Sequence, residues 1–415
     1  MKYLYCKLLA LSPLAMRSDH APGGVMTAHF VSGTTFAGSL AAAHRALARG
    51  KDVDAEFENL FLQENVYYPN LYPALFTDKS MSDSVLPVYP VPKTAQTCKR
   101  FPGFRHRFKN DRGPEERHGV RDTLFDWAIF ALGNSARALH QHRECPECHA
   151  AMDYFDGYYR NHRSRQHQMI SSLTHKRVQT HTGINRESGT VQEDILYSRE
   201  VLEEDMQFWG KVKITHDGLV EILQQAIKKI DHEEILRIGT GRSRGTGNVR
   251  IEIGEIENEK DSREERFEVF KERLQLFDNE LRKRVNIDNL APFYFAITLH
   301  APLILRDKLL RYRGVIDGET LAELTKIPAL KLIHKTGGLQ RVMGWNDLWS
   351  TPRPHEYAID TGSVFLFASL EKEGHDNSLL QALFELEENG MGSRKAEGFG
   401  HLCISDPFHR ETKLC

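Results

Sequence analysis

Three cysteines in one charged region have the spacing of metal ligands. Cys145 and Cys148 are separated by two residues, a gap that lets both thiolates hold one tetrahedral zinc ion, and Cys98 is a natural third ligand. His149 follows directly and is the predicted fourth ligand. The alternatives for the fourth position are His118, His140 and His142. The polar surroundings offer little to build a core, which favours a structural zinc over a redox pair or unmodified thiols.

A glycine-rich stretch with arginines offers a second chemistry, phosphate binding. Residues 237–253 read RIGTGRSRGTGNVRIEI. Glycine lets backbone N–H groups approach an anion, and arginine adds forked donors for phosphate oxygens. The candidate phosphate contacts are Gly239, Gly241, Arg242, Ser243, Arg244, Gly245 and Gly247. The alternative is a turn whose glycines serve backbone geometry and whose arginines are solvated.

The order of elements around this loop excludes two common nucleotide sites. No lysine follows its glycines, as a Walker loop requires. A helix is predicted before the loop from the apolar residues Ile222, Leu223, Ala226, Ile227 and Ile230. A strand is predicted after it from Val249, Ile251 and Ile253. A dinucleotide-binding loop follows a strand and opens a helix, so this reversed order argues against one.

Length and charge place broad limits on the protein. Its 415 residues suffice for two or three domains with substantial cores. The 55 lysines and arginines nearly balance 57 aspartates and glutamates, so any nucleic-acid site is a local patch. There is no apolar run of about 18 residues, and the start lacks a signal-peptide cleavage pattern. We therefore expect a cytoplasmic protein that is not bound to a membrane.

The two ends of the chain repeat one pattern. A strand in YLYCKLLALSPL ends in Ser12-Pro13-Leu14, and a strand in FYFAITLHAPL ends in Ala301-Pro302-Leu303. Near the C-terminus a helical stripe precedes the glycine-rich loop GMGSRKAEGFG (390–400) and the strand HLCIS. That stripe consists of Leu379, Leu380, Leu383 and Leu386. This pattern predicts an α+β fold of two tandem β-α-β-β-α-β, ferredoxin-like units.

The predicted domains are residues 1–255, with an insertion at about 55–190, and residues 291–415. Between them, 256–290 is strongly charged, but apolar residues recur at helical spacing behind a capping box formed by Ser262 and Glu265. These apolar residues are Phe267, Phe270, Leu274, Phe277 and Leu281. We expect an amphipathic connecting helix that packs on its own domain, with a docking surface as the alternative.

Two further segments are candidates for contact with phosphate or bases. Gly33, Thr34 and Thr35 open an alanine-rich helix, whose N–H groups and hydroxyls could bind an anion unless Ser32 or Thr34 simply caps it. In the insertion, Tyr158 and Tyr159 are available to stack on bases among basic residues. Those basic residues are Lys99, Arg100, Arg105, Arg107, Lys109, Arg112, Arg160, Arg163, Arg165, Lys176 and Arg177.

An ordered series of segments resembles the RAMP superfamily of CRISPR-associated proteins, most closely the type III-D effector subunit that caps the 5′ handle of the crRNA. The segments are SGTTFAGSLAAA (32–43), LPVYPVPKTAQTCKRFPGF (86–104), HTGINRESGT with ILYSREVL (181–202), RIGTGRSRGTGNV (237–249) and GMGSRKAEGFG (390–400). The resemblance implies RRM-like RAMP domains that bind RNA within a multisubunit, RNA-guided interference complex for antiviral defence.

The resemblance also implies roles for individual residues. A hairpin in the region of 181–195 would insert beside the guide RNA, which makes His181, Asn185 and Arg186 candidate contacts. The C-terminal loop adds Arg394 and Lys395. Glu397 in that loop would repel phosphate, so a subunit contact or a role within the fold is the alternative.

Together these features predict a non-catalytic subunit that binds the 5′ handle of the crRNA. By resemblance, its partners are the large polymerase-like subunit and the backbone RAMP subunits, and it meets target RNA only through the complex. The alternative is a metal-independent endoribonuclease that processes precursor crRNA, as some RAMP relatives do. His44 on the first helix would then be the general acid or base.

Overall fold

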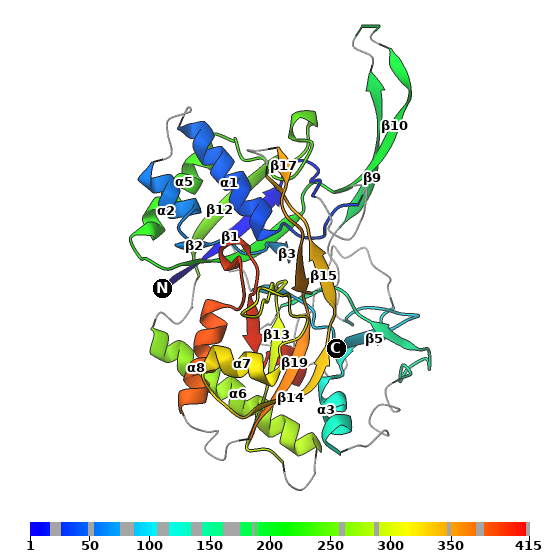
Figure 1. Ribbon diagram of the computed structural model, residues 1–415. Coiled ribbons are helices and arrows are strands. Elements are labelled where there is room, and N and C mark those ends of the chain that lie inside the picture. Colours follow the sequence, from blue (N-terminus) through cyan, green and yellow to red (C-terminus); the bar gives the residue numbers. More distant parts are fainter. Residues whose placement is uncertain are drawn as a thin grey trace.

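The computed structural model describes residues 1–16, 26–48, 54–74, 87–105, 116–133, 143–160, 175–184, 187–188, 190–256, 262–285, 290–346, 350–370 and 377–411. Two halves lie one above the other in Figure 1, and each is built on an antiparallel sheet. A hairpin of two long strands projects from the upper half (Figure 1). No helix in these ranges is long and apolar enough to cross a bilayer.

The first half is a sheet covered by three helices. Its strands are β1 (Lys2–Ala10), β2 (Val66–Tyr67), β3 (Tyr72–Ala74), β11 (Gln207–Ile214) and β12 (Val249–Glu255). They lie in the order β12-β1-β11-β2, with β3 also paired to β11. Helices α1 (Gly33–Leu47), α2 (Ala55–Phe61) and α5 (Leu219–His232) complete this half.

Alternation along the strands builds the core of the first half. Leu4, Cys6 and Leu8 are buried against α1 and α5 because every second residue of a strand faces the same side. The predicted helix before the glycine-rich loop is confirmed as α5, and the predicted strand after it as β12. Ile222, at the edge of the α5 stripe, is 36% exposed and does not belong to the core.

The second half has the same order of elements. Its strands are β13 (Phe293–Leu299), β14 (Leu330–Thr336), β19 (Val364–Ser369) and β20 (Leu402–Ile404), and its helices are α7 (Gly318–Thr325), α8 (Asn377–Asn389) and α9 (Pro407–Glu411). The order β14-β19-β13-β20 places the first strand between the third and fourth, as in the first half. The fold is therefore mixed α and β with antiparallel sheets. The predicted opening strand and the closing helix, loop and strand are confirmed.

The two glycine-rich loops are held in place by equivalent backbone hydrogen bonds. In each half, two loop amides donate to the segment around the proline that follows the first strand. The donor and acceptor pairs, with N···O distances, are Gly247 to Pro13 (2.9 Å), Thr240 to Ala15 (2.8 Å), Gly400 to Pro302 (2.8 Å) and Ser393 to Ile304 (3.0 Å). The repeated sequence pattern thus corresponds to a repeated docking of loop on strand.

Helix α6 (Arg263–Val285) follows the first half and packs on the second. The Ser262 hydroxyl accepts a 3.0 Å hydrogen bond from the amide of Glu265, as the predicted capping box requires. Phe270 and Leu274 pack in the core beside α8, whereas Phe277, Leu281 and Val285 cover the opposite face of the second sheet. A helix thus lies inside the segment predicted to connect the domains, and its apolar stripe is used within the chain.

The segment between β3 and β11 contributes small sheets and one long hairpin. Its elements are β4 (Val88–Pro90), β5 (Ala95–Cys98), β6 (Val120–Asp122), α3 (Leu124–Gly133), β7 (Met152–Tyr154), β8 (Tyr158–Arg160), β9 (Lys176–Ile184) and β10 (Val191–Leu202). Strands β6-β5-β7 form one sheet, β4 pairs with β8, and β9 pairs with β10. Helix α3 packs on the second half, where Phe125 and Phe277 are 5.3 Å apart between ring centroids.

A buried polar joint also fixes this segment to the second half. The Tyr159 hydroxyl donates to Asp406, whose Oδ2 lies 2.7 Å from Nε2 of His300. Burial opposes the charge of Asp406, but its hydrogen bond with His300 keeps the pKa of this carboxyl below its usual value. Tyr158 and Tyr159 are 8% and 1% exposed. The prediction that these tyrosines are available for RNA bases is wrong, because both lie in the core.

A ribbon of short strands extends from the lower half toward the upper half (Figure 1). It consists of β15 (Leu339–Val342), β16 (Trp345–Asn346), β17 (Thr351–Pro352) and β18 (Glu356–Ile359). β15 pairs with β18 and β16 pairs with β17, so the chain turns back on itself. Glu356 at the start of β18 contacts Arg394 in the second glycine-rich loop, with an N···O distance of 2.6 Å. The ribbon and that loop are therefore joined.

Candidate metal centre and nucleic-acid interface

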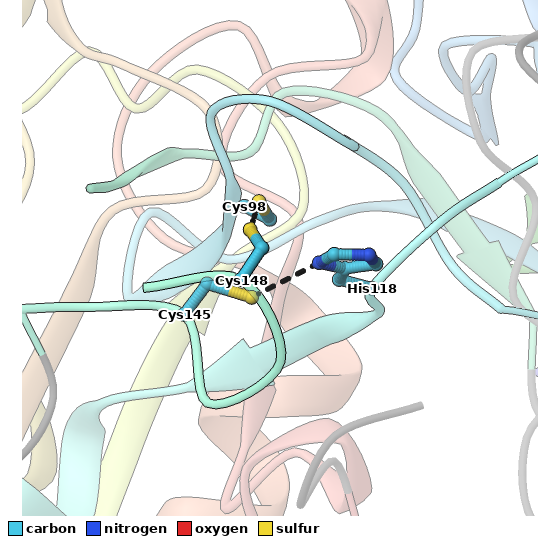
Figure 2. Close-up of side chains that lie close together, drawn as sticks. All are labelled: Cys98, His118, Cys145 and Cys148. Carbon is cyan, nitrogen blue, oxygen red and sulfur yellow. Dashed lines mark hydrogen bonds between the residues drawn. The ribbon is translucent and has the colours of Figure 1, made fainter. Parts of the chain in front are cut away.

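Cys98, His118, Cys145 and Cys148 meet at one point beside the β6-β5-β7 sheet (Figure 2). Cys98 ends β5, His118 lies just before β6, and Cys145 and Cys148 lie in the turn before β7. The Cys98 and Cys148 sulfurs are 3.5 Å apart, and Nδ1 of His118 is 3.2 Å from the Cys145 sulfur. Three loops that are distant in sequence thus converge on one small volume.

This group fits a single metal ion. Its four ligand atoms all lie within 4.8 Å of one another. A tetrahedral zinc with Zn–S bonds of about 2.3 Å separates two thiolates by about 3.8 Å, which is close to the observed spacing. Three sulfurs and one imidazole nitrogen form a known donor set for structural zinc. The four side chains could therefore hold a metal without a large rearrangement.

Neighbouring groups orient these ligands. Nε2 of His118 lies 3.2 Å from the Glu116 carboxylate, which leaves Nδ1 directed at Cys145. The Phe101 amide donates to the Cys98 sulfur at 3.4 Å. Burial opposes ionisation of Cys98, but this amide and the adjacent cysteines keep the pKa of the thiol below its usual value. Burial raises the pKa of the neighbouring Cys148 thiol, so of these two sulfurs only Cys98 is favoured as a thiolate before a metal binds.

His149, the fourth ligand predicted from the sequence, lies outside this group. It has a positive φ of 55° and a side chain 80% exposed, with Nδ1 3.8 Å from Glu144. The turn that directs Cys148 inward therefore directs its neighbour outward. His118, one of the alternatives, takes the fourth position, while His140 and His142 lie outside the described residues.

The tip of the first glycine-rich loop is exposed. A short 3-10 turn, η1 (Arg242–Arg244), is flanked by Gly241 and Gly245 with φ of 75° and 79°. The four residues 242–245 are all exposed. The outer glycines of the loop, Gly239 and Gly247, instead face the backbone of their own half. The loop thus combines a structural base with a basic tip that reaches solvent.

The middle of the β9–β10 hairpin adds aromatic and basic groups to this tip. Arg244 donates to the Tyr197 hydroxyl, and the Tyr197 ring stacks on His181 with centroids 5.2 Å apart. Arg199 lies against Gly241, where an added Cβ would stand 2.8 Å from its guanidinium. Burial, and also the charge of Arg244, holds the pKa of Arg199 below its usual value. An anion bound here would relieve the repulsion between these arginines.

Of the residues predicted on the hairpin, His181 belongs to this cluster, while Asn185 and Arg186 lie outside the described residues. Tyr197 and Arg199 were not singled out from the sequence. The strand register explains why they join the cluster: His181 pairs with Tyr197, and Gln179 pairs with Arg199. These side chains therefore share the face of the hairpin toward the loop. We name His181, Tyr197, Arg199, Arg242 and Arg244 the loop–hairpin cluster.

The second glycine-rich loop is closed by its own acidic neighbours. Arg394 pairs with Glu397 at 2.8 Å and with Glu356 at 2.6 Å, and its guanidinium lies 4.7 Å from the Phe399 ring centroid. Burial opposes the charge of Arg394, but the two carboxylates raise the pKa of this group. Arg394 is thus engaged within the fold. Lys395 is partly exposed at the start of η2 (Lys395–Glu397).

The tip of that loop docks on the N-terminus of α1, where Gly33, Thr34 and Thr35 were predicted to bind an anion. The Gly33 amide donates to Asn70 Oδ1 at 2.8 Å, and the Thr35 amide donates to the Ser32 hydroxyl at 3.3 Å. The same Asn70 donates to the Gly398 carbonyl at 3.0 Å. The structure therefore gives these groups protein partners and joins the two halves there.

Comparison with known proteins agrees with this architecture. A family model of the RAMP superfamily matches residues 7–250. The chain belongs to the RAMP superfamily. The matched residues run from β1 through α1 and the first glycine-rich loop into β12. No curated protein matches the chain.

Solved structures that are similar to this RAMP protein include chains of CRISPR complexes. A chain of the type III-B Cmr-beta complex bound to cognate target RNA is 11% identical, with 87% of this chain and 86% of that chain covered and a TM-score of 0.39. A chain of the same complex bound to cognate target RNA and AMPPnP is 13% identical, with 87% of this chain and 86% of that chain covered and a TM-score of 0.38. A chain of a type IV-B CRISPR complex is 10% identical, with 63% of this chain and 94% of that chain covered and a TM-score of 0.27.

Proposed function

We propose that this RAMP protein is a non-catalytic, RNA-binding subunit of a type III CRISPR effector complex that caps the 5′ handle of the crRNA, as the type III-D subunit does. The observation that carries this proposal is the loop–hairpin cluster. It combines exposed arginines with a stacked histidine and tyrosine at a glycine-rich turn. Cations for phosphates beside aromatic rings for bases are what single-stranded RNA requires.

The proposed domains are two ferredoxin-like units, residues 1–255 and 291–415, with a connecting segment at 256–290 that includes α6. The repeated strand, helix, strand, strand, helix, strand order supports this proposal. Equivalent docking of both glycine-rich loops supports it as well. In this assignment the first unit offers the RNA-binding tip, and the second unit uses its tip to hold the halves together.

The proposed partners are the large polymerase-like subunit and the backbone RAMP subunits, with target RNA met only through the complex, in the cytoplasm. The projecting hairpin supports a place within a larger assembly (Figure 1). Its face opposite the loop–hairpin cluster carries Val178, Ile184 and Leu196, which are 67%, 67% and 68% exposed. A two-stranded ribbon with such an apolar face is marginally stable alone and gains from a neighbouring surface.

A structural zinc is proposed for Cys98, His118, Cys145 and Cys148. The four protein ligands would complete a tetrahedral shell and leave no position for a reacting water. Their role would be to fix three loops of the insertion to one point. This role suits a segment whose small sheets have few strands.

The non-catalytic assignment is supported by the surroundings of His44. Its Nε2 lies 3.0 Å from the Glu56 carboxylate, and the Phe57 and Phe61 rings lie 5.9 and 5.7 Å away between centroids. The side chain is 12% exposed, so it offers little surface to a substrate. We expect His44→Ala to leave the yield of mature crRNA unchanged, as measured by sequencing the bound RNA. Accumulation of uncut precursor would instead favour the endoribonuclease.

The RNA-binding proposal predicts a specific salt dependence. Arg242→Ala with Arg244→Ala is expected to weaken binding of an RNA that carries the 5′ handle at least about tenfold, because two charge-assisted contacts are lost. The slope of log affinity against log salt should fall by about 1.4, since each phosphate contact on single-stranded RNA contributes about 0.7. Fluorescence anisotropy across a salt series measures both quantities.

The matched control is Lys228→Ala with Lys229→Ala, which removes the same charge from exposed positions of α5. It should change affinity and slope far less. Equal effects of the two double variants would point to a general electrostatic attraction. Unchanged binding by the arginine variant would indicate a scaffold that does not touch RNA.

A further inference from the structure

Glu200 follows Arg199 on β10 but belongs to the other face of the hairpin, because successive side chains of a strand alternate. Its Oε2 accepts hydrogen bonds of 2.9 Å from the Thr27 amide and of 3.0 Å from Nζ of Lys176. The same Nζ donates to the Thr27 carbonyl at 2.8 Å. Three residues that are distant in sequence thus form a closed ring of hydrogen bonds at the base of the hairpin. We name Thr27, Lys176 and Glu200 the hairpin anchor.

The hairpin anchor is largely withdrawn from solvent. Thr27 is 2% exposed, and the Lys176 and Glu200 side chains are 15% and 22% exposed. Burial opposes the charge of Glu200, but the Thr27 amide and Lys176 keep the pKa of this carboxyl below its usual value. The carboxylate is therefore ionised at neutral pH, where both of its contacts are charge-assisted. Such contacts hold their geometry better than those of an exposed ion pair.

The anchor is joined to the segment that also receives the first glycine-rich loop. The Met16 amide donates to the hydroxyl of the anchor threonine at 2.9 Å. Leu14 exchanges two backbone hydrogen bonds with Leu202 at the base of β10. The carbonyls of the alternate residues, Pro13 and Ala15, accept hydrogen bonds from the loop. One edge of this short segment thus binds the hairpin side and the other edge binds the loop, so hydrogen bonds connect the two without interruption.

This connection matters because the cations of the loop–hairpin cluster come from both parts. Arg199 reaches the loop from β10, where it lies against Gly241, and Arg244 reaches the hairpin from the loop. The separation of their guanidinium groups depends on how the hairpin leaves the first half. We propose that Glu200 is a positioning residue for RNA, because through the hairpin anchor it holds Arg199 and Arg244 at the spacing that phosphate contacts need. The inference rests on the proposed RNA binding and concerns a residue that does not itself touch the RNA.

Charge alone would give Glu200 the opposite effect on RNA. A carboxylate close to phosphates repels them, so its removal should strengthen binding if only long-range electrostatics mattered. Loss of the hairpin anchor instead releases the hairpin from Thr27 and lets Arg199 and Arg244, which repel each other, move apart. The proposal therefore requires that removal of a negative charge weakens RNA binding.

The test measures binding of the full chain to a labelled single-stranded RNA that carries the 5′ handle, by fluorescence anisotropy. Glu200→Ala is expected to weaken binding at least about threefold. Glu200→Gln keeps a side-chain oxygen as acceptor for the Thr27 amide and should bind within about twofold of the wild type. Glu204→Ala is the matched control, because it removes the same charge just beyond β10, where Glu204 pairs with Arg177 at 2.9 Å and is 45% exposed. It should not weaken binding.

A double-mutant cycle tests whether Glu200 acts through Arg199. Arg199→Ala alone should weaken binding because one charged contact is lost. Adding Glu200→Ala should then weaken binding less than it does in the wild type, since the arginine that the anchor positions is absent. Effects that simply add would mean that the two residues act independently, and they would overturn the inference. Binding by Glu200→Ala at or above the wild-type affinity would overturn it as well.

Hydrogen exchange gives a second measurement that does not depend on the folding of a variant. Binding of the same RNA to the wild-type protein should slow exchange of the Thr27 amide, because a site that the anchor positions must stabilise the anchor in return. Unchanged exchange at Thr27 in the RNA-bound protein contradicts the positioning role. A wild-type protein that binds no RNA contradicts the proposed function itself, an outcome distinct from any result with the variants.

Discussion

His118→Ala is expected to abolish metal binding, whereas His149→Ala is expected to leave one zinc ion per chain. The reason is geometric: His118 directs Nδ1 at the three cysteines, while the His149 side chain is 80% exposed and turned toward Glu144. Elemental analysis of the purified variants decides between the two histidines. Zinc in closed sites of this type contributes about 10–16 kcal/mol of apparent binding free energy in small domains. Its loss should therefore unfold the surrounding loops.

Local unfolding of these loops can be followed by hydrogen exchange. The Cys145 amide donates to the Ala150 carbonyl at 2.7 Å and should lose protection in His118→Ala. Treatment of the wild-type protein with a strong chelator should reproduce this loss, and added zinc should reverse it. A wild-type protein that contains no metal, or a His149→Ala variant that loses it, would contradict the proposed centre.

Gly398→Ala is expected to destabilise the junction of the two halves far more than Gly245→Ala. Both glycines end the 3-10 turn of their loop, with φ of 88° and 79°, so alanine costs about 1–2 kcal/mol of backbone strain at either position. A Cβ at 398 would also stand 2.8 Å from Asn70 Oδ1 and 3.0 Å from the Gly33 Cα, whereas nothing lies within 4 Å at 245. Relief of this overlap should cost about 1–3 kcal/mol more.

The free energy of unfolding in denaturant compares these two variants. The Tyr68 amide is a local reporter, since it donates to the Ala396 carbonyl at 3.0 Å across the junction. We expect it to exchange faster in Gly398→Ala and at the wild-type rate in Gly245→Ala. Equal stability of the variants would mean that the halves adjust to the added methyl group without loss of contact.

The elements that could be predicted from the sequence are those with a clear apolar period. The alternation in FYFAITL fixes β13, and leucines at helical spacing fix α8. Both faces of β13 are buried, one against α7 and α8 and the other against α3 and α6. The burial of α3 on the second half could not be predicted, because that helix comes from the insertion and its apolar residues do not identify a distant partner.

The metal centre was predicted in part for a similar reason. Cys145 and Cys148 are close in sequence, so their spacing alone identifies them as a pair. His118 and Cys145 are brought together by strand pairing between β5, β6 and β7, which is a tertiary feature. His149 was preferred because it is adjacent in sequence. Its left-handed backbone conformation sends it to the opposite side, and no sequence pattern reports this.

The two glycine-rich loops show the same limit. Their sequences are alike enough to predict one role for both, and their bases do dock alike. The tips differ because Glu356 and Glu397 neutralise Arg394, while the first tip lies beside Tyr197 and Arg199. The sequence alone indicated that the Glu397 carboxylate would repel a phosphate at the second tip. The contribution of Glu356 depends on the fold of the β15–β18 ribbon.

The tip of the second glycine-rich loop docks on the N-terminus of α1, so the contact between the halves is asymmetric. Ser32-Gly33-Thr34-Thr35 and Asp317-Gly318-Glu319-Thr320 open equivalent helices, each with a capping side chain that accepts from the threonine amide. The loop tip of the second half thus contacts the N-terminus of the first helix in the other half. Such a contact is head-to-tail, and it could continue from one copy to the next if every copy repeated it. Here the first tip is exposed. The contact is therefore made once, within the protein, and the equivalent tip of the first half stays accessible at the surface.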